Sequence, residues 1–234
     1  MDLLQLREQE IFLTLQRIAQ YSFVLIGGYA VNAYTLPRFS TDCDIVLEHE
    51  DELHNIKKEL GRFGYQKEKE STAVPYKGTF YRYEKEIEHG FKVSMDILVH
   101  TVLDRQTNAT FDAGWIFAHS EKQVLRGKTI TEELKIRVIT IDALIAMKML
   151  CCRNTDIRDI FMLMPKAKNI SWIQNEVGNR YNFENRFLKI KEKITSAQFK
   201  SNLQGVYGFV DPVLFDKHKN AVLALQHGGQ IRAK

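Results

Sequence analysis

The chain has 234 residues, enough for one large domain or for a small α/β domain with a helical appendage. Hydrophobic residues make up 44% of it, charged residues 26%, and only four residues are proline, which excludes a disordered or fibrous protein. The net charge of +4 is small and does not by itself identify a class of partner.

No targeting or membrane segment is expected from the sequence. Charged residues interrupt residues 1–20, and no apolar run reaches the roughly 18 residues that a membrane span needs. The three cysteines, Cys43, Cys151 and Cys152, do not make a disulfide framework. We therefore expect a cytoplasmic protein with reduced thiols and no membrane contact.

Apolar periodicity and turn residues predict alternating helices and strands in the first half of the chain. The expected elements, in order, are a helix over about 3–20, a strand over 23–26, a short helix over 29–36 that Pro37 ends, a strand over 43–47, a helix over 52–62, and a hairpin of 79–83 with 91–99. Gly27 and Gly28 form the turn between the first strand and the short helix.

Beyond about residue 105 the pattern becomes mainly helical. The expected elements are strands near 128–130 and 136–140, helices over about 142–152, 156–163, 172–179, 184–199 and 212–226, and a frayed tail over 228–234. Between Arg180 and Lys234, ten Lys or Arg stand against four Asp or Glu. A solvated basic face is the commoner meaning of such an excess, and a polyanionic partner is the alternative.

Three aspartates carry the chemical information in the first half. Side chains on a strand alternate between the two faces, so Asp42 and Asp44 point the same way while Cys43 points the other way. Asp96 lies on the polar face of a second strand, together with Ser94. If the two strands are neighbours, three carboxylates converge, and hard oxygen ligands of this kind suit Mg²⁺ with a triphosphate. An Asp-x-Asp pair alone is more often a solvated turn.

This arrangement would serve phosphoryl transfer. A metal held by Asp42 and Asp44 would orient a triphosphate, and a second metal shared with Asp96 would lower the pKa of an attacking hydroxyl. Asp96 is also a candidate to accept the proton of that hydroxyl. The Gly27-Gly28 turn would let backbone N–H groups approach phosphate oxygens without a Cβ in the way.

The stretch LIGGYAVNAYTLPRFSTDCDIVLE, followed by VSMDILVH, resembles the signature of the polymerase-beta-like nucleotidyltransferase superfamily over about residues 22–100. The resemblance implies an α+β fold with a mixed β-sheet backed by helices, two Mg²⁺ ions, and transfer of a nucleoside monophosphate from a nucleoside triphosphate to a hydroxyl. It assigns metal binding to Asp42, Asp44 and Asp96 and phosphate binding to Gly27 and Gly28. Many members have Gly-Ser at this turn, so Gly28 is a departure that weakens a polymerase interpretation.

A second stretch, IDALIAMKMLCCRNTDIRDIFML, resembles the downstream motif of the abortive-infection type of nucleotidyltransferase toxin. The resemblance places Lys148 near the triphosphate and gives Asp159 a supporting polar role at the active-site cleft. The alternative is that Lys148 extends from a helix edge to solvent and that Arg158 and Asp159 form a local ion pair.

Arg38 and the Ser40-Thr41 pair immediately precede the first two aspartates, and the same toxin-like proteins often have an arginine and a small hydroxyl residue there. We expect Arg38 and Thr41 to contact phosphate. The alternative is structural, with Thr41 ordering the start of the strand.

These patterns predict a nucleotidyltransferase catalytic core over residues 1–105, with a mixed and then mainly helical C-terminal region over 106–234 packed against it. The leading hypothesis is a magnesium-dependent nucleotidyltransferase toxin that acts on RNA or tRNA and is paired with an antitoxin protein. One alternative keeps the chemistry with an aminoglycoside or lincosamide antibiotic as acceptor. Another is a catalytically silent nucleotide-binding protein, although three converging carboxylates have little use without metal.

Overall fold

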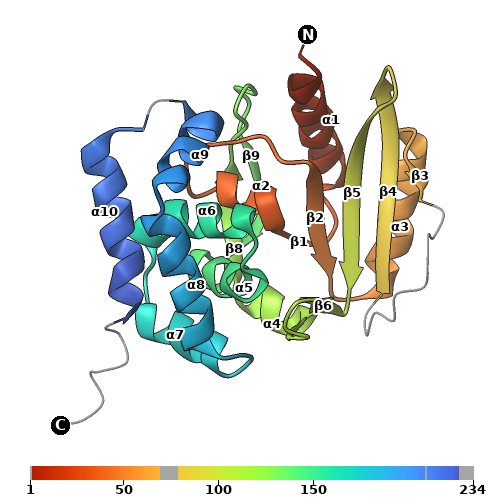
Figure 1. The fold of residues 1–234 in the computed structure, drawn as a ribbon. Helices are drawn as coiled ribbons and strands as arrows, with labels where there is room; N and C mark the ends of the chain where they lie inside the picture. Colours follow the sequence, from red (N-terminus) through yellow and green to blue (C-terminus); the bar gives the residue numbers. More distant parts are fainter. Residues whose placement is uncertain (1, 69–78, 209, 227–234) are drawn as a thin grey trace. The chain divides into compact units, whose positions relative to one another are not determined.

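The computed structural model describes residues 2–68, 79–208 and 210–226, and the chain divides into two compact units (Figure 1). The first consists of Met1–Ala33, Pro37–Leu103 and Thr110–Ile139, and the second of Tyr34–Leu36, Asp104–Ala109 and Thr140–Lys234. We call them the sheet unit and the helical unit. The division near Ile139 comes later than the boundary predicted after residue 105, because two more strands complete the sheet.

Among the described residues, the sheet unit contains a mixed sheet of seven strands in the order β3-β4-β5-β2-β1-β9-β8. The strands are β1 (Val24–Ile26), β2 (Asp42–Leu47), β3 (Gln66–Lys67), β4 (Thr79–Glu88), β5 (Phe91–Val99), β8 (Ser120–Leu125) and β9 (Leu134–Ile139). The pairs β2–β5 and β1–β9 are parallel, and the others are antiparallel. A separate short ribbon pairs β6 (Thr101–Leu103) with β7 (Thr110–Asp112). The predicted mixed sheet backed by helices is confirmed.

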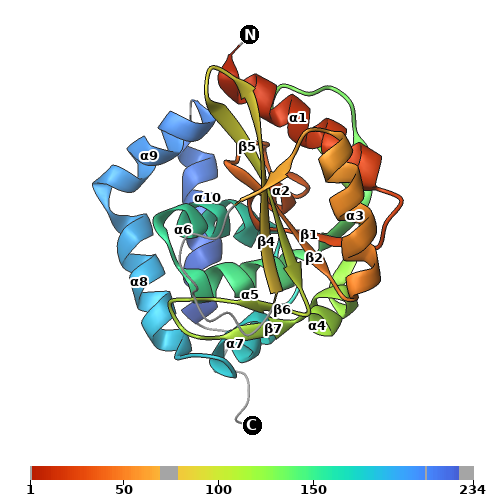
Figure 2. The same ribbon diagram turned by 90° about the vertical axis from the view of Figure 1, so that its right-hand side faces the viewer.

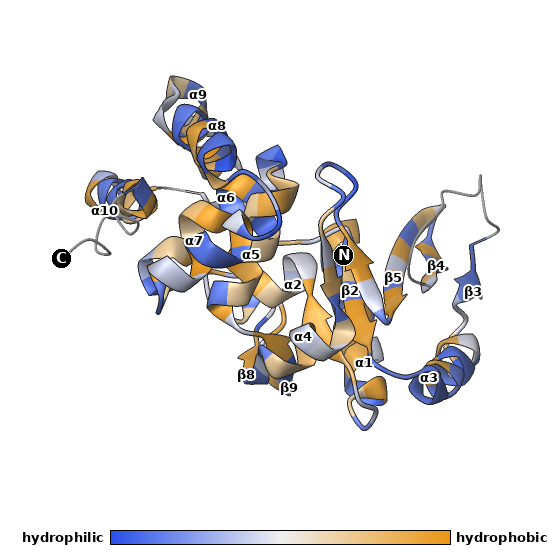
Figure 3. Cartoon of the chain, turned by 90° about the horizontal axis from the view of Figure 1, so that it is seen from below, coloured by the Kyte–Doolittle hydropathy of each residue, from blue (hydrophilic) through white to orange (hydrophobic). Residues whose placement is uncertain are grey.

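Two helices, α1 (Leu3–Ile18) and α3 (Glu50–Arg62), lie on the same side of β2, β4 and β5 (Figures 2 and 3). Most of the β2 and β5 side chains that alternate toward them are buried, and Cys43 and Met95 are fully buried. Burial of this face against the apolar stripes of two amphipathic helices fixes which way each strand faces. The opposite side chains of β2 and β5 include the three aspartates. The short helices α2 (Gly27–Asn32) and α4 (Ala113–Ala118) complete the unit.

The helical unit is built around α5 (Ile141–Cys151), in which every residue from Ala143 to Leu150 is buried. Figure 3 shows this helix mostly in hydrophobic colours, whereas α3 is mostly hydrophilic. A helix that is apolar all round needs packing partners on every side. Its main partners within the unit are α6 (Asn154–Leu163), α7 (Ile170–Gly178) and α8 (Phe183–Thr195). The unit also contains α9 (Ala197–Tyr207) and α10 (Pro212–Leu223), with 3-10 turns at Met164–Lys166 and Ala224–Gln226.

Two predicted elements are wrong. Residues 128–130 form a loop instead of a strand, because the backbone N–H groups of Lys128 and Thr129 donate to the buried Glu8 carboxylate at 2.7 and 2.8 Å. The helix predicted over 184–199 is two helices, since Ser196 is extended, with φ −70° and ψ 144°.

The other predicted helices and strands form near their expected positions, except that the short helix α2 ends at Asn32, before Pro37, and β4 continues to Glu88. The strands β3, β6, β7 and β8 and the helix α4 were not predicted. The predicted tail over 228–234 lies outside the described residues. In the part of the chain that the structure describes, no helix is both long and apolar enough to cross a membrane.

Candidate active site

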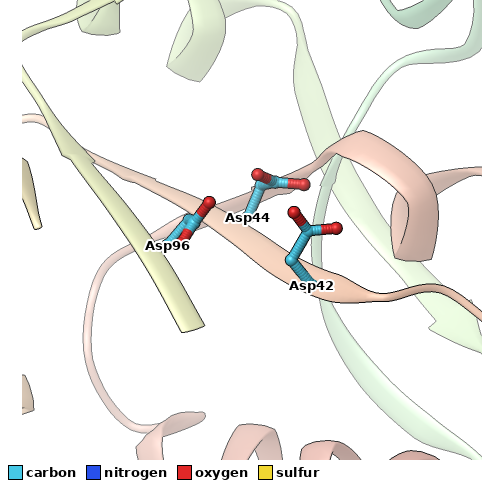
Figure 4. A group of neighbouring side chains, drawn as sticks. All are labelled: Asp42, Asp44 and Asp96. Carbon is cyan, nitrogen blue, oxygen red and sulfur yellow. The ribbon is translucent and has the colours of Figure 1, made fainter. Parts of the chain in front are cut away.

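Three carboxylates meet on the face of the sheet opposite α1 and α3. Asp42 and Asp44 project from β2 and Asp96 from β5, and one oxygen of each lies within 4.8 Å of the others (Figure 4). The parallel pairing of the two strands places Asp44 opposite Asp96 and Asp42 opposite Ser94. The convergence that the sequence predicted for neighbouring strands is therefore present.

The alternation of the strand separates this polar face from the core. Cys43, between the two aspartates, is fully buried on the other side of β2. Burial, and secondarily the Asp44 and Asp42 charges, raise the pKa of the Cys43 thiol well above its ordinary value. A thiol that stays protonated is a poor nucleophile and metal ligand. Cys43 therefore belongs to the core and takes no part in the site.

The three carboxylates differ in exposure. The Asp42 side chain is 38% exposed, whereas the Asp96 side chain is 6% exposed. Burial raises the pKa of Asp96 above its ordinary value, although the hydrogen bond and charge of Arg82 act in the opposite direction. Asp96 thus forms the floor of the cluster, and Asp42 lies at its solvent side.

Arg82 on β4 is a site residue that sequence reasoning missed. Its Nε donates to Asp96 Oδ1 at 2.8 Å and its Nη2 to Asp96 Oδ2 at 2.6 Å, while Nη2 is 3.5 Å from Asp42 Oδ2. The hydrogen bond from Arg82 to Asp96 raises the pKa of this guanidinium above its ordinary value. The positively charged guanidinium of Arg82 is therefore already bound to Asp96, the most buried carboxylate of the acidic cluster.

The register of the hairpin explains why Arg82 was missed. The turn at His89-Gly90 pairs Glu88 with Phe91, and a regular ladder from there would put Tyr83 opposite Asp96. An irregularity between Glu86 and Glu88 shifts the register by one residue, so Arg82 pairs with Asp96 instead. Such a shift moves every following side chain to the other face.

The Gly27-Gly28 pair was predicted as a turn before the short helix, but α2 begins at Gly27, so this turn is the first turn of that helix, and it lies close to the Asp44 carboxylate. Gly27 has φ +68°, and a Cβ there would lie 2.0 Å from Asp44 Oδ2. A Cβ on Gly28 would lie 2.1 Å from Ser40 Oγ and 3.4 Å from Arg38 Nη2. Only a residue without a side chain fits next to the Asp44 carboxylate at position 27 and next to the Ser40 hydroxyl at position 28. The turn thus forms one wall of the site.

Arg38 and Ser40 lie against this turn. Arg38 is 6% exposed, and its backbone is held by Asn32, which accepts from Arg38 N at 3.1 Å and donates to Arg38 O at 2.9 Å. Ser40 is 9% exposed, whereas Thr41 is exposed. Ser40 precedes Asp42 by two residues, the spacing that places side chains on one face of an extended chain, and this signal could have identified it.

Lys148 and Asp159 lie in the helical unit. Lys148 Nζ is 2.9 Å from Asp159 Oδ2 and 3.2 Å from Asp156 Oδ1, and the three side chains are 8%, 0% and 12% exposed. Asp156 also accepts from Arg153 N at 3.1 Å, which caps α6. Asp156 was missed by the sequence analysis. The predicted contact of Lys148 and Asp159 with a nucleotide stays a prediction.

The residues of the sheet unit fit a divalent cation that prefers oxygen. Three carboxylates offer converging ligand atoms, and Gly27 leaves the space beside Asp44 open, which a Cβ would fill. Mg²⁺ is usually bound by a small number of carboxylates together with waters and substrate phosphates. Three carboxylates that leave the other coordination positions open therefore suit Mg²⁺.

Comparisons with known proteins identify one family match and several solved structures with a similar fold. The family described as "Nucleotidyl transferase AbiEii toxin, Type IV TA system" matches residues 14–163. No curated protein matches the chain. Among solved structures, the chain is similar to MenT4, a nucleotidyltransferase toxin of Mycobacterium tuberculosis, with 14% identity, a TM-score of 0.58, and coverage of 96% of this chain and 83% of that one.

JHP933 from Helicobacter pylori is also similar, with 14% identity, a TM-score of 0.51, and coverage of 97% of this chain and 92% of that one. At these identities the two structures show a shared fold. The family match covers more than half of the chain, including every residue of the acidic cluster.

Proposed function

The chain belongs to the nucleotidyl transferase AbiEii toxin family of type IV toxin–antitoxin systems and is a nucleotidyltransferase. We propose that it transfers a nucleoside monophosphate to a hydroxyl of RNA, with tRNA as the leading acceptor. The observation that carries the proposal is the convergence of Asp42, Asp44 and Asp96 beside the Gly27-Gly28 turn. We further propose that two Mg²⁺ ions and a nucleoside triphosphate complete the site, that an antitoxin protein is its partner, and that it acts in the cytoplasm.

The carboxylates have separate roles in this proposal. Bound Mg²⁺ would supply charge neutralisation of the triphosphate and a lower pKa of the attacking hydroxyl. Asp42 and Asp44 would hold one ion on the nucleotide side, because they share one face of β2 beside the phosphate turn, and Asp96 would bind the second ion. Asp96 takes the proton of the acceptor hydroxyl as that oxygen attacks the α-phosphorus and pyrophosphate leaves.

The backbone of Gly27 and Gly28 would receive the triphosphate, together with two neighbouring side chains. The Arg38 guanidinium is positioned by its bond to Phe39 O at 3.0 Å and lies next to the turn, where a planar cation suits phosphate oxygens. Ser40 provides a hydroxyl at the place where Gly28 has no side chain. Among the hydroxyl residues before β2, the structure favours Ser40 over the predicted Thr41 as the phosphate contact.

Basic side chains in the helical unit favour RNA as the acceptor. Lys189, Lys191 and Lys193 follow one another along α8, and Lys200 lies on α9. Lys189 is exposed and the others are half-buried, so their charges can reach a polyanion. A cationic antibiotic would instead need an acidic acceptor surface.

The acceptor can be identified directly. The protein is incubated with each α-labelled nucleoside triphosphate, Mg²⁺, and either total tRNA or a panel of aminoglycosides and lincosamides, beside Asp42→Asn. We expect label on RNA, loss of label in the Asp42→Asn reaction, and no antibiotic product. Label on an antibiotic alone would replace RNA as the acceptor, and absence of label on both would support the silent nucleotide-binding alternative.

A further inference from the structure

One charged row crosses three adjacent strands of the sheet. Arg82 on β4 pairs with Asp96 on β5, and Asp96 pairs with Asp44 on β2. Side chains directly opposite one another on neighbouring strands lie on the same face. The guanidinium and the metal-binding carboxylates therefore share one surface, with Asp96 in the middle of the row.

Arg82 engages both oxygens of Asp96. The two hydrogen bonds, at 2.8 Å from Nε and 2.6 Å from Nη2, form a bidentate pair. Charge-assisted bidentate bonds of this kind are among the strongest side-chain interactions. The same Nη2 lies 3.5 Å from Asp42 Oδ2, so Arg82 reaches the carboxylates of both strands.

A divalent cation bound between these carboxylates would meet Arg82 as a competitor. It would be repelled by the positive charge of Arg82 and would compete for the oxygens that already accept from the guanidinium. The Arg82 side chain is 34% exposed, whereas that of Asp96 is 6% exposed, so the arginine is the member of the pair with room to move. Glu68 lies within electrostatic reach of Arg82 and contributes to its raised pKa, which identifies an alternative partner.

We propose that Arg82 is an internal counter-ion of Asp96 that a divalent cation must displace, and that Arg82 thereby sets the metal affinity of the Asp96 side of the site. This inference rests on the proposed function, since it takes the acidic cluster to be the metal site. Arg82 also neutralises the buried Asp96 carboxylate before metal binds, which limits repulsion with Asp42 and Asp44. Arg82 is therefore a positioning residue.

Mn²⁺ binding to the full chain tests the competition without measuring catalysis. Free Mn²⁺ is followed by electron paramagnetic resonance during titration of the wild type, Arg82→Gln, Arg82→Gln/Asp96→Asn and Asp42→Asn. The matched control is Lys85→Gln, which removes the same charge from β4, where Lys85 pairs with Glu10 instead. We expect Arg82→Gln to bind Mn²⁺ about tenfold more tightly, within the usual range of coupling between two ligands.

The expected gain disappears in Arg82→Gln/Asp96→Asn and is absent in Lys85→Gln. Equal or weaker Mn²⁺ binding by Arg82→Gln, with binding still reduced by Asp42→Asn, would overturn the competition and leave the proposed function intact. If neither the wild type nor Arg82→Gln binds Mn²⁺, both proposals fail.

Thermal unfolding gives a second readout. Arg82→Gln leaves a buried carboxylate without its cation, so we expect a lower Tm without Mn²⁺ and a larger rise on adding Mn²⁺ than in the wild type. If Arg82→Gln does not fold, Arg82→Lys keeps the charge but loses the bidentate geometry, and its Mn²⁺ affinity should lie above that of the wild type. No gain in affinity for Arg82→Lys would then overturn the inference.

Discussion

Charged side chains cluster in both units, but the two clusters differ in net charge and in exposure. In the described part of the sheet unit, three carboxylates meet a single guanidinium, and the outer members Asp42 and Arg82 are 38% and 34% exposed. In the helical unit, Lys148 meets Asp156 and Asp159 under nearly complete burial, and Arg158 Nε lies 3.7 Å from Asp159 Oδ1. Balanced and buried charges join helices, whereas a surplus of carboxylates at an accessible face is suited to binding cations.

The strongest effect on folding is expected from Lys148→Met. This change leaves Asp159, which is 0% exposed, without its 2.9 Å partner. Breaking a buried pair by removing one partner typically costs about 3–5 kcal/mol, so the free energy of unfolding in urea should fall by that amount. The double variant Lys148→Met/Asp159→Asn should recover part of the loss. A variant as stable as the wild type would show that this cluster does not hold the helices together.

Gly27→Ala should damage the sheet unit in a different way. The new Cβ meets Asp44 Oδ2 at 2.0 Å, and φ is +68°. The left-handed backbone alone costs about 1–2 kcal/mol, and displacement of Asp44 should also abolish transfer. Gly61→Ala in α3 is the matched control, because nothing lies within 4 Å of its Cβ position. It should raise stability by about 0.5–1 kcal/mol, and equal losses in the two variants would contradict the role of Gly27.

The smallest effect concerns pH and the helical unit. Burial lowers the pKa of His218 below its ordinary value, although its bond to Phe161 O at 2.9 Å opposes this. A histidine with a depressed folded pKa stabilises the fold above its unfolded pKa of about 6.5, and this contribution is lost as pH falls through the folded pKa. The Tm of His218→Gln should therefore fall less than that of the wild type between neutral and mildly acidic pH. Identical slopes for His218→Gln and the wild type would refute the assignment.

The face of each aspartate could be predicted from the sequence, because the period of two along a strand is local and regular. Asp42, Asp44 and Asp96 therefore converge as expected. The register of β4 could not be predicted, since it depends on an irregularity between Glu86 and Glu88 that no turn residue announces. For that reason the sequence did not identify Arg82 as a site residue.

Long-range pairing accounts for the other differences. The loop at Lys128 and Thr129 is fixed by Glu8, about 120 positions earlier in the chain. The edge strand β8 is half-exposed and has no clear alternation, so its pattern gave little signal. The resemblance pointed to Lys148 and Asp159, but the pairing of Lys148 with Asp156 requires the fold of α5 against α6.

The variant Asp44→Asn tests the central claim most directly. Its label transfer and its Tm are measured and compared with those of Asp51→Asn. Asp51 is an exposed acid on α3, so its replacement makes the same charge change away from the cluster. We predict that Asp44→Asn lowers label transfer by at least about 100-fold, while its Tm equals or exceeds that of the wild type because one of three crowded like charges is removed. Retained transfer, or a loss of stability as large as that of Lys148→Met, would contradict the assignment of this face as the site of nucleotidyl transfer.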